Sequence, residues 1–380
     1  MAKHHLIYAA LAVVCLAGLA GFFVLVFPWH GRLAEQNVTI TATVPDHGQG
    51  SCRGTGCAST AAYSGALPAA VTRLASTTTT LLFVGDMMFD RTVATRSSAA
   101  KSTAYPFARI GNLKQGVFGE HDLVIGNLEG PVTSVKKPEP KSIDFSFKPE
   151  ILSVLKAEGL DAVSQANNHS LDQGSSGAQE SLRHIALFGL TPFGSELKDD
   201  ATSSLAMLEA RGKKIALLGF NTTDHGLNRT LAGQAMAQAR AAADYVIVFM
   251  HWGQEYKDKP NADQTALAHW FIDQGAAAVM GSHPHWMESV ETYRGRPIVY
   301  SLGNFIFDQD WSRETDYGLV AGLALSPQAS ELKLFPIKII KSQPMLLDGA
   351  ERQVRLDRLA KISPPELSTA IAQGVLALPL

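Results

Sequence analysis

Residues 244–253 read DYVIVFMHWG, a run of β-branched, aromatic and other apolar residues that ends in His251. A continuous apolar run of this kind, bounded by polar residues, indicates a strand that is buried on both of its faces. Similar runs occur in TLLFVGD, DLVIGNLEG, LDAVSQANNHS, KIALLGFN, AAAVMGSHPH and PIVYSLGNF, and helix-like segments such as DQTALAHWFIDQG separate them. The alternation predicts an α/β domain whose central strands are covered on both sides.

Two later segments, GLVAGLALS and ELKLFPIKII, also have the composition of strands, with no obvious helix between them. They fit either an antiparallel edge of the main sheet or a second sheet. We place the domain at residues 80–345 and treat residues 346–380 as a C-terminal tail with two helices and no chemistry.

Carboxylates, carboxamides and imidazoles follow the apolar runs. They are Asp86, Asn127, Glu129, Asn167, Asn168, His169, His251, His283, His285 and Asn304. In open α/β sheets ligands bind beyond the carboxyl ends of the strands, so these residues are expected to converge on one site. Oxygen and imidazole ligands without cysteine favour a divalent ion such as Zn, Mn or Fe.

Two of the histidines stand one proline apart in SHPHW. A residue before proline is biased toward an extended conformation, and alternate residues of an extended segment point to the same side. His283 and His285 are therefore expected to reach one metal ion, or two adjacent ions.

Several of these residues also have an ordinary structural interpretation. His251 alone fits a hydrogen-bonded core position, Asp86 fits a helix N-cap, and Asn304 in LGNF is favoured as a turn residue. Surface or packing roles are favoured for His121, His184, His225 and His269, and a solvated segment for Glu288 and Glu291. The joint occurrence of the strand-end residues is what points to a site.

The N-terminal segment is apolar and uncharged from Leu6 to Phe27. It is long enough to cross a bilayer, and we favour an uncleaved single-pass anchor (residues 1–30) over a cleaved signal peptide. Residues 31–79 then form a flexible extracytoplasmic linker. Within it, Cys52 and Cys57 fit a small disulfide, although two free thiols are an equal alternative.

Charge excludes one class of partner. The 380 residues include 18% charged residues, with a formal net charge of −2 and a pI near 6.6. Nucleic-acid binding depends on a basic surface, so a nucleic-acid partner is not expected.

The ordered motifs FVGDMMFDR, VIGNLEGPVT, SQANNHSLDQG, VFMHWGQEY and GSHPHWMESVETYRGRPIVYSLGNFIFD span Phe83 to Asp308. Together they resemble the CapA or PgsA-like poly-γ-glutamate capsule proteins, which belong to the calcineurin-like metallophosphoesterase superfamily. The resemblance implies a layered αββα metallophosphatase fold, preceded in this chain by the transmembrane helix.

The resemblance also implies metal ligands at Asp86, Asn168, His251, His283 and His285. One metal position would keep Asn168, His251 and His283, whereas the other would keep little beyond Asp86 and His285.

This chain departs from the superfamily pattern in two places. Met88 stands where a histidine ligand is usual, and Asn127 stands where a bridging aspartate is usual, with Glu129 as the nearest carboxylate that both positions could share. The sequence is therefore compatible with either one or two bound metal ions.

Two further residues are candidates for catalysis. By resemblance, His169 lies near the leaving group and is a candidate general acid. Arg91, five residues after Asp86, is a candidate clamp for a phosphate or a γ-glutamyl carboxylate, and a surface position on the first helix is its equal alternative.

The expected function is synthesis or export of a poly-γ-glutamate-type polymer at the cell membrane, beside membrane synthase subunits. The first alternative is a metal-dependent hydrolase, either a phosphoesterase or an amidase, at the cell surface. The second is a structural module with a degenerate site that binds no metal.

Overall fold

The computed structural model describes residues 78–379, apart from 116, 117, 120, 138, 139, 198–203 and 328. The predicted membrane anchor, nearly all of the linker, and Cys52 and Cys57 lie outside the described residues. No helix among the described residues combines the length and the apolar character that a membrane span needs.

The first sheet has nine strands and is mixed. Four parallel strands run side by side: β1 (Thr79–Met87), β2 (Leu123–Leu128), β3 (Ala162–Ser164) and β4 (Thr191–Phe193). On the other side of β1 the sheet continues antiparallel through β12 (Tyr317–Leu325), β13 (Ala329–Ile340) and β14 (Gln343–Leu346). The short strand β11 (Asn304–Ile306) pairs with the end of β1.

The second sheet has six strands, in the order β5-β6-β7-β8-β10-β9. Its parallel centre is formed by β6 (Lys213–Asn221), β7 (Tyr245–His251), β8 (Ala278–Ser282) and β10 (Arg296–Val299). The edge strands β5 (Leu205–Ala210) and β9 (Val290–Tyr293) are antiparallel to their neighbours. All seven apolar runs of the sequence correspond to strands, and GLVAGLALS and ELKLFPIKII are the antiparallel pair β12 and β13.

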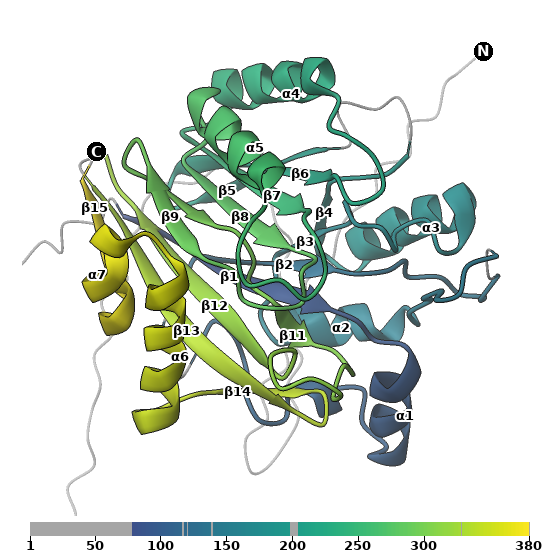
Figure 1. Ribbon diagram of the computed structural model, residues 1–380. Helices are drawn as coiled ribbons and strands as arrows, with labels where there is room; N and C mark the ends of the chain where they lie inside the picture. The colour runs from purple at the N-terminus through teal and green to yellow at the C-terminus, as the bar shows by residue number, and fades with distance from the viewer. Residues whose placement is uncertain are drawn as a thin grey trace, which may run out of the picture. The chain divides into compact units, whose positions relative to one another are not determined.

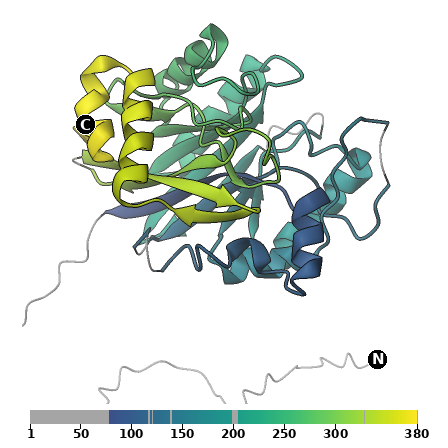
Figure 2. The same cartoon turned by 60° about the horizontal axis from the view of Figure 1, so that its bottom comes forward.

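Helices cover the outer faces of the two sheets. The first sheet packs against α1 (Arg91–Ala99), α2 (Glu150–Ala157), α3 (Gly174–Leu187) and the 3-10 helix η1 (Tyr105–Phe107). The second sheet packs against α4 (Arg229–Ala242) and α5 (Ala262–Asp273). A third apolar cluster combines side chains from β1 and β2 with side chains from β6 and β7, so the inner faces of the sheets meet. The α/β class is confirmed, and Figures 1 and 2 show α4 and α5 on the opposite side of the sheets from α1 and α2.

Strand β7 shows why its sequence is apolar throughout. Val246 and Val248 belong to the cluster beneath α4 and α5, whereas Ile247 and Phe249 belong to the cluster between the sheets. Because successive side chains of a strand point to opposite faces, a strand with two covered faces needs apolar residues at every position.

The C-terminal segment is part of the same domain. Residues 346–380, which we expected as a tail, do contain two helices, α6 (Gly349–Ile362) and α7 (Ser368–Gln373), joined by η3 (Pro365–Leu367). They also end in an unexpected strand, β15 (Val375–Pro379), which pairs antiparallel with β13. Leu356, Ile371 and Leu376 enter the cluster between the sheets, so these residues complete the core instead of following it.

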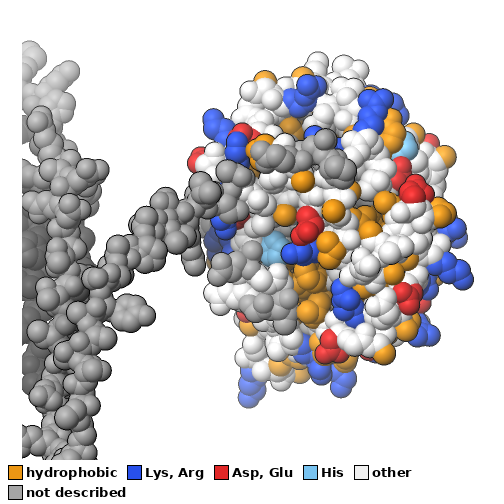
Figure 3. Space-filling view, turned by 90° about the vertical axis from the view of Figure 1, so that its left-hand side faces the viewer, with side chains coloured by type: hydrophobic (Ala, Val, Ile, Leu, Met, Phe, Trp, Pro, Cys, Tyr) orange, Lys and Arg blue, Asp and Glu red, His pale blue; other side chains and the backbone are white. Residues whose placement is uncertain are grey.

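The surface carries both signs of charge. Figure 3 shows the side of the molecule that lies at the left in Figure 1, where basic, acidic and hydrophobic side chains are interspersed. This mixture agrees with a net charge close to zero.

Candidate metal centre

The strand-end side chains of both sheets meet in one buried place. Asp86 on β1 lies opposite Asn127 on β2 and opposite Asn304 on β11, so three strands of the first sheet contribute to it. His251, at the end of β7, lies opposite Ser282 on β8 in the second sheet. All five residues are buried. The convergence predicted from the sequence is therefore observed.

His251 has its two ring nitrogens in different surroundings. Nδ1 lies 2.9 Å from the Ser282 Oγ atom, whose hydroxyl group donates to the backbone carbonyl of Met250 at 3.1 Å. The Nδ1 atom also lies 3.3 Å from Asn127 Nδ2, and the tautomer in which Nδ1–H donates to Ser282 Oγ is the one that leaves a lone pair on Nε2 for a metal ion. Nε2 lies 2.8 Å from Asn168 Oδ1 and 3.2 Å from His283 Nδ1. A metal-binding histidine typically donates its other ring N–H to the protein in this way.

A group of possible ligands lies on the carboxylate side of His251. Single ligand atoms of Asp86, Glu129 and His251 all lie within 4.8 Å of one another. Glu129 is fully buried, and its Oε1 atom has no hydrogen-bond partner. An unpartnered buried carboxylate oxygen is costly unless a proton or a cation neutralises the group, so the residues present fit a metal ion.

Burial sets the protonation of the centre. Burial, together with the nearby charge of Asp86, raises the pKa of Glu129 well above its ordinary range. Burial also lowers the pKa of His251 well below its usual value, and lowers the pKa of His283 to about 3. Both imidazoles are therefore neutral at physiological pH, which is the form that binds a metal.

Asn127 is oriented by a chain of hydrogen bonds. Asn167 Nδ2 donates to the carbonyl of Leu128 at 3.0 Å, and Asn167 Oδ1 accepts from the backbone N–H of His169 at 3.2 Å, so both ends of Asn167 are fixed. Asn167 Nδ2 also donates to Asn127 Oδ1 at 3.1 Å. Asn127 must therefore point its NH₂ group toward the carboxylates, where it donates to Asp86 Oδ1 at 2.8 Å. In this orientation the Asn127 amide is a donor, and its oxygen is turned away from the expected bridging position.

His285 is held by Asn304. Asn304 Nδ2 donates to the carbonyl of Thr315 at 3.2 Å, so Asn304 Oδ1 faces His285 Nδ1 at 2.9 Å. The Nε2 atom of His285 lies 3.7 Å from Glu129 Oε1. Asn304, which we favoured as a turn residue, instead begins strand β11 and orients a site residue.

The backbone of the His-Pro-His segment is not extended, contrary to our expectation. His283 and His285 have φ values of 94° and 58°, in the left-handed region that favours glycine. The backbone N–H of His283 donates to Asp86 Oδ2 at 3.2 Å, and the carbonyl of Pro284 accepts from the N–H of Tyr256 at 2.9 Å. These bonds hold a bend that still brings the two imidazole rings within 6.0 Å of each other.

Met88 does not contribute a ligand from this position. It is buried in the apolar cluster beneath α1, and its Sδ atom accepts from the backbone N–H of Asp90 at 3.0 Å.

His169 lies at the rim of the centre, with its side chain 14% exposed. Its Nδ1 atom lies 2.7 Å from Asp172 Oδ2, and its ring packs on Phe145 at 4.3 Å between centroids. Burial acts to raise the pKa of Asp172, but bonds from His169, Lys141 and the Phe145 N–H outweigh it, so the pKa is held below its ordinary value. The Asp172 carboxylate therefore stays charged and fixes the orientation of His169.

Arg91 also lies at the rim. It forms an ion pair with Asp308, and its guanidinium carbon lies 5.0 Å from the ring centre of Phe145 and 5.8 Å from that of Phe307. Phe145 contacts His169 and Phe307 contacts His285, so Arg91 is separated from the centre by one layer of aromatic rings.

A known protein family matches the part of the chain that contains the candidate metal centre. The family model described as "Bacterial capsule synthesis protein PGA_cap" matches residues 80–309. The chain belongs to this family. The matched range of the PGA_cap family contains every candidate metal and catalytic residue described above.

Two curated relatives support the PGA_cap assignment. The chain is 34% identical over 280 residues to "PGA biosynthesis protein CapA" of Bacillus subtilis (strain 168), which covers 69% of this chain and 72% of the relative. It is 30% identical over 302 residues to "Capsule biosynthesis protein CapA" of Bacillus anthracis. This alignment covers 73% of this chain and 72% of the relative.

Two solved structures share a distant similarity with this PGA_cap chain. A phosphatase from Mycoplasma pneumoniae aligns with 14% identity and a TM-score of 0.38, over 71% of this chain and 91% of that one. A hypothetical protein from Thermus thermophilus aligns with 16% identity and a TM-score of 0.38. This alignment covers 70% of this chain and 96% of that chain.

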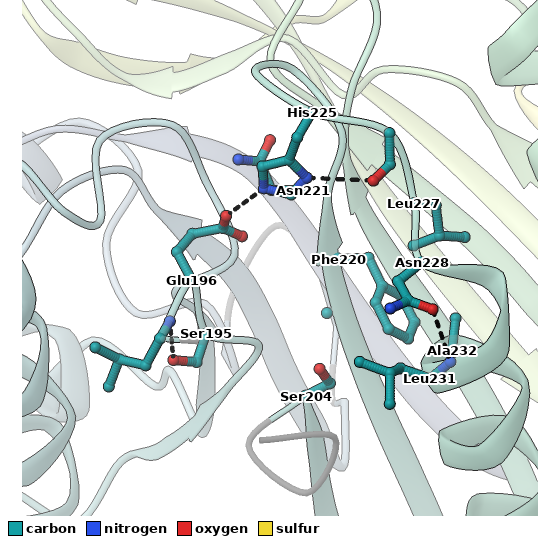
Figure 4. Close-up of a pocket in the computed structure, with 13 residues that line it drawn as sticks. Ser195, Glu196, Ser204, Phe220, Asn221, His225, Leu227, Asn228, Leu231 and Ala232 are labelled. Carbon is teal, nitrogen blue, oxygen red and sulfur yellow. Dashed lines mark hydrogen bonds and ion pairs between the residues drawn. The ribbon is translucent and has the colours of Figure 1, made fainter. Parts of the chain in front are cut away.

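A cavity of about 260 Å³ lies at the end of β6, one strand away from His251 (Figure 4). Phe220, Leu227 and Leu231 provide apolar walls, and His225 Nε2 lies 2.8 Å from Glu196 Oε2 across its edge. His225 is exposed, as we expected.

The two glutamates of the segment that we expected to be solvated are not free in solvent. Glu288 is fully buried, and Glu291 lies 2.6 Å from both the His269 Nε2 atom and the Tyr300 hydroxyl. The polar composition of WMESVETY concealed this burial, because both carboxylates have partners that are distant in the sequence.

Proposed function

We propose that this PGA_cap protein binds a divalent metal ion in a metallophosphatase-type fold and acts in the synthesis or export of a poly-γ-glutamate-type polymer. The observation that carries the proposal is the convergence of His251, His283 and Asn168 from both sheets, beside the unpartnered oxygen of Glu129. The names of the CapA relatives support the polymer. An apolar anchor at residues 6–27 would hold the domain outside the membrane.

The ligand set fits Zn, Mn or Fe, since it combines neutral imidazoles with amide and carboxylate oxygens. Asn168, His251 and His283 would hold one ion, and Glu129 and Asp86 are the nearby carboxylates that could add oxygen ligands. A bound ion would supply Lewis acidity toward the oxygen of an amide or a phosphoester.

We infer that a second ion is not held, because the Asn127 amide occupies the space between the carboxylates as a donor. A bridging position needs an oxygen that faces the centre, and Asn167 keeps the Asn127 oxygen turned away. Met88 also removes an imidazole from that half of the centre.

The residues at the rim can hold and transfer a proton. His169 donates Nδ1–H to the charged Asp172, so Nε2 is available to exchange a proton with a bound polymer. This pair supports the second candidate function, a metal-dependent hydrolase of an amide or a phosphoester. The first candidate remains an accessory role in which the centre binds the carboxylates of the polymer without cleaving it, and Arg91 and Lys141 would contribute positive charge.

The test measures metal content and polymer cleavage with the purified full-length chain. We expect one ion per chain in the wild type, loss of the ion in His251→Ala, and retention in the matched control His225→Ala, which changes an exposed histidine. Asn127→Asp should raise the content to two ions, whereas Asn228→Asp, an exposed helix cap, should not.

Poly-γ-glutamate is then added to each variant. Metal-dependent chain shortening that His251→Ala abolishes would establish the hydrolase, and binding without shortening would establish the accessory role. A wild type that holds no metal, or that neither binds nor cleaves the polymer, would overturn the proposal.

A further inference from the structure

An exposed tryptophan lies on the loop of residues 307–316, between β11 and β12. Trp311 leaves 64% of its surface in contact with solvent. Exposing an indole forgoes the free energy of burying a large apolar side chain, so such a residue on a fixed loop is a candidate contact for a ligand.

The loop is held firmly in place. Ion pairs of Asp308 with Arg91 and of Asp310 with Arg96 attach it to α1 on both sides of residue 309. Inside the loop, the Thr315 hydroxyl donates to the Gln309 carbonyl at 2.6 Å. Trp311 is therefore an exposed side chain on a loop that two ion pairs and an internal hydrogen bond hold in place.

Trp311 is connected to the metal centre through Tyr256. The two rings pack edge to face, with centroids 4.9 Å apart and an interplanar angle of 80°. The Tyr256 ring also faces His285, with centroids 6.2 Å apart and an interplanar angle of 30°. Gln309 Nε2 lies 3.4 Å from the Tyr256 hydroxyl, and Gln309 Oε1 accepts from Asn304 Nδ2 at 3.0 Å. We call Tyr256 and Trp311 the aromatic ledge.

The position of Tyr256 is itself strained. Its φ of 62° lies in the left-handed region, and the bond from its N–H to the Pro284 carbonyl maintains that conformation. Strain of this kind persists where the surrounding structure requires one geometry. The ledge thus has a fixed position relative to His283 and His285.

We propose that the aromatic ledge is a binding subsite for the uncharged backbone of a side-chain-linked glutamyl polymer, and this inference rests on the proposed function. Each unit of such a polymer has two methylene groups and an amide between its carboxylates. Methylene groups pack on an indole face, and amide groups stack on it. Because the ledge leads directly to His285, a chain lying on Trp311 would bring a neighbouring unit to the metal centre.

The test uses the tryptophan emission of the full-length chain, titrated with poly-γ-glutamate oligomers. We expect the oligomer to change the emission of the wild type, and we expect Trp311→Phe to remove most of that change. Trp270→Phe, which alters a half-buried residue on α5, should leave it intact. Affinity for the oligomer should fall about five-fold or more in Trp311→Ala and recover in Trp311→Phe.

Leu187→Ala is the matched control for loss of an exposed apolar side chain, because Leu187 is 80% exposed on α3. It should bind the oligomer as the wild type does, and metal content should be equal in all variants. If the wild type binds the oligomer and Trp311→Ala binds it equally well, the ledge is overturned while the proposed function stands. If dextran, an uncharged sugar polymer, binds at Trp311 and the oligomer does not, the polyamide occupant is wrong. If a metal-loaded wild type binds no oligomer, both proposals fail.

Discussion

Glu288 carries a carboxyl group that is fully buried beside α5. Its Oε2 atom accepts a hydrogen bond from Gln264 Nε2 at 2.8 Å, and its Oε1 atom has no partner. Burial raises the pKa of Glu288 to about 8, although the bond from Gln264 opposes the shift. The side chain is therefore protonated at neutral pH and acts as a neutral polar group in the core.

The free energy of unfolding should therefore fall as rising pH favours the ionised form of this carboxyl group. The ordinary pKa is 4.5, so between pH 4.5 and about 8 the folded state binds more protons than the unfolded state. The stabilising contribution is complete below pH 4.5 and is lost as pH rises through 8, which amounts to a few kcal/mol. We expect Glu288→Gln to remove this slope, measured by urea unfolding at pH 5, 7 and 9. The exposed Glu209→Gln should keep the wild-type slope, and parallel curves for wild type and Glu288→Gln would contradict the prediction.

Strand β15 belongs to a hydrophobic core whose other residues come mostly from strands much earlier in the sequence. Strand β15 pairs with β13 over five residue pairs, from Ala329 opposite Pro379 to Lys333 opposite Val375. Leu376 is 1% exposed, whereas its neighbour Val375, which points to the other face, is 37% exposed. The period of two distinguishes the two faces of the strand.

Truncation of these two neighbours should have different costs. Leu376→Ala removes a buried side chain from the cluster between the sheets and should lower the free energy of unfolding by about 2–4 kcal/mol. Val375→Ala on the same strand should cost less than about 1 kcal/mol. Chemical denaturation of both variants measures the difference, and equal costs would show that β15 does not contribute to the core.

At the scale of the whole molecule, the candidate metal centre joins the two sheets. Asp86 and Glu129 come from the first sheet, while His251 and His283 come from the second. An ion bound by both would stabilise the packing of one sheet against the other, because it binds only where both sets of ligands are in place.

Removal of the metal should therefore lower the thermal stability of the domain. An ion present at a hundred times its Kd would contribute about 2.7 kcal/mol, so we expect a chelator to lower the Tm of a folded unit of this size, residues 78–379, by about 4 °C. Metal added back should restore the Tm, and His251→Ala should not respond to the chelator. A wild type whose Tm is the same with and without chelator would contradict the prediction.

The sequence predicted the parts of this molecule that depend on local pattern. Runs such as YVIVFM identified the central strands, because a strand with two covered faces is apolar throughout. The convergence of the strand-end residues could be predicted because the carboxyl ends of neighbouring parallel strands are adjacent in space. The role of Asn304 and the burial of Glu288 were missed, since both depend on partners brought together by the tertiary fold. The strand β15 was missed because VLALP carries no signal of its pairing with β13.

The bend at His283 and His285 would affect how the protein takes up the proposed ion. A left-handed backbone at two non-glycine residues is formed at a cost of about 1–3 kcal/mol each, and that cost is met during folding. An arriving ion would therefore encounter imidazoles that are already in place, so little of its binding free energy would be spent on reshaping the loop. Metal uptake by such a preorganised centre would then depend on how readily the ion sheds its water, which would make the choice of metal partly a matter of kinetics.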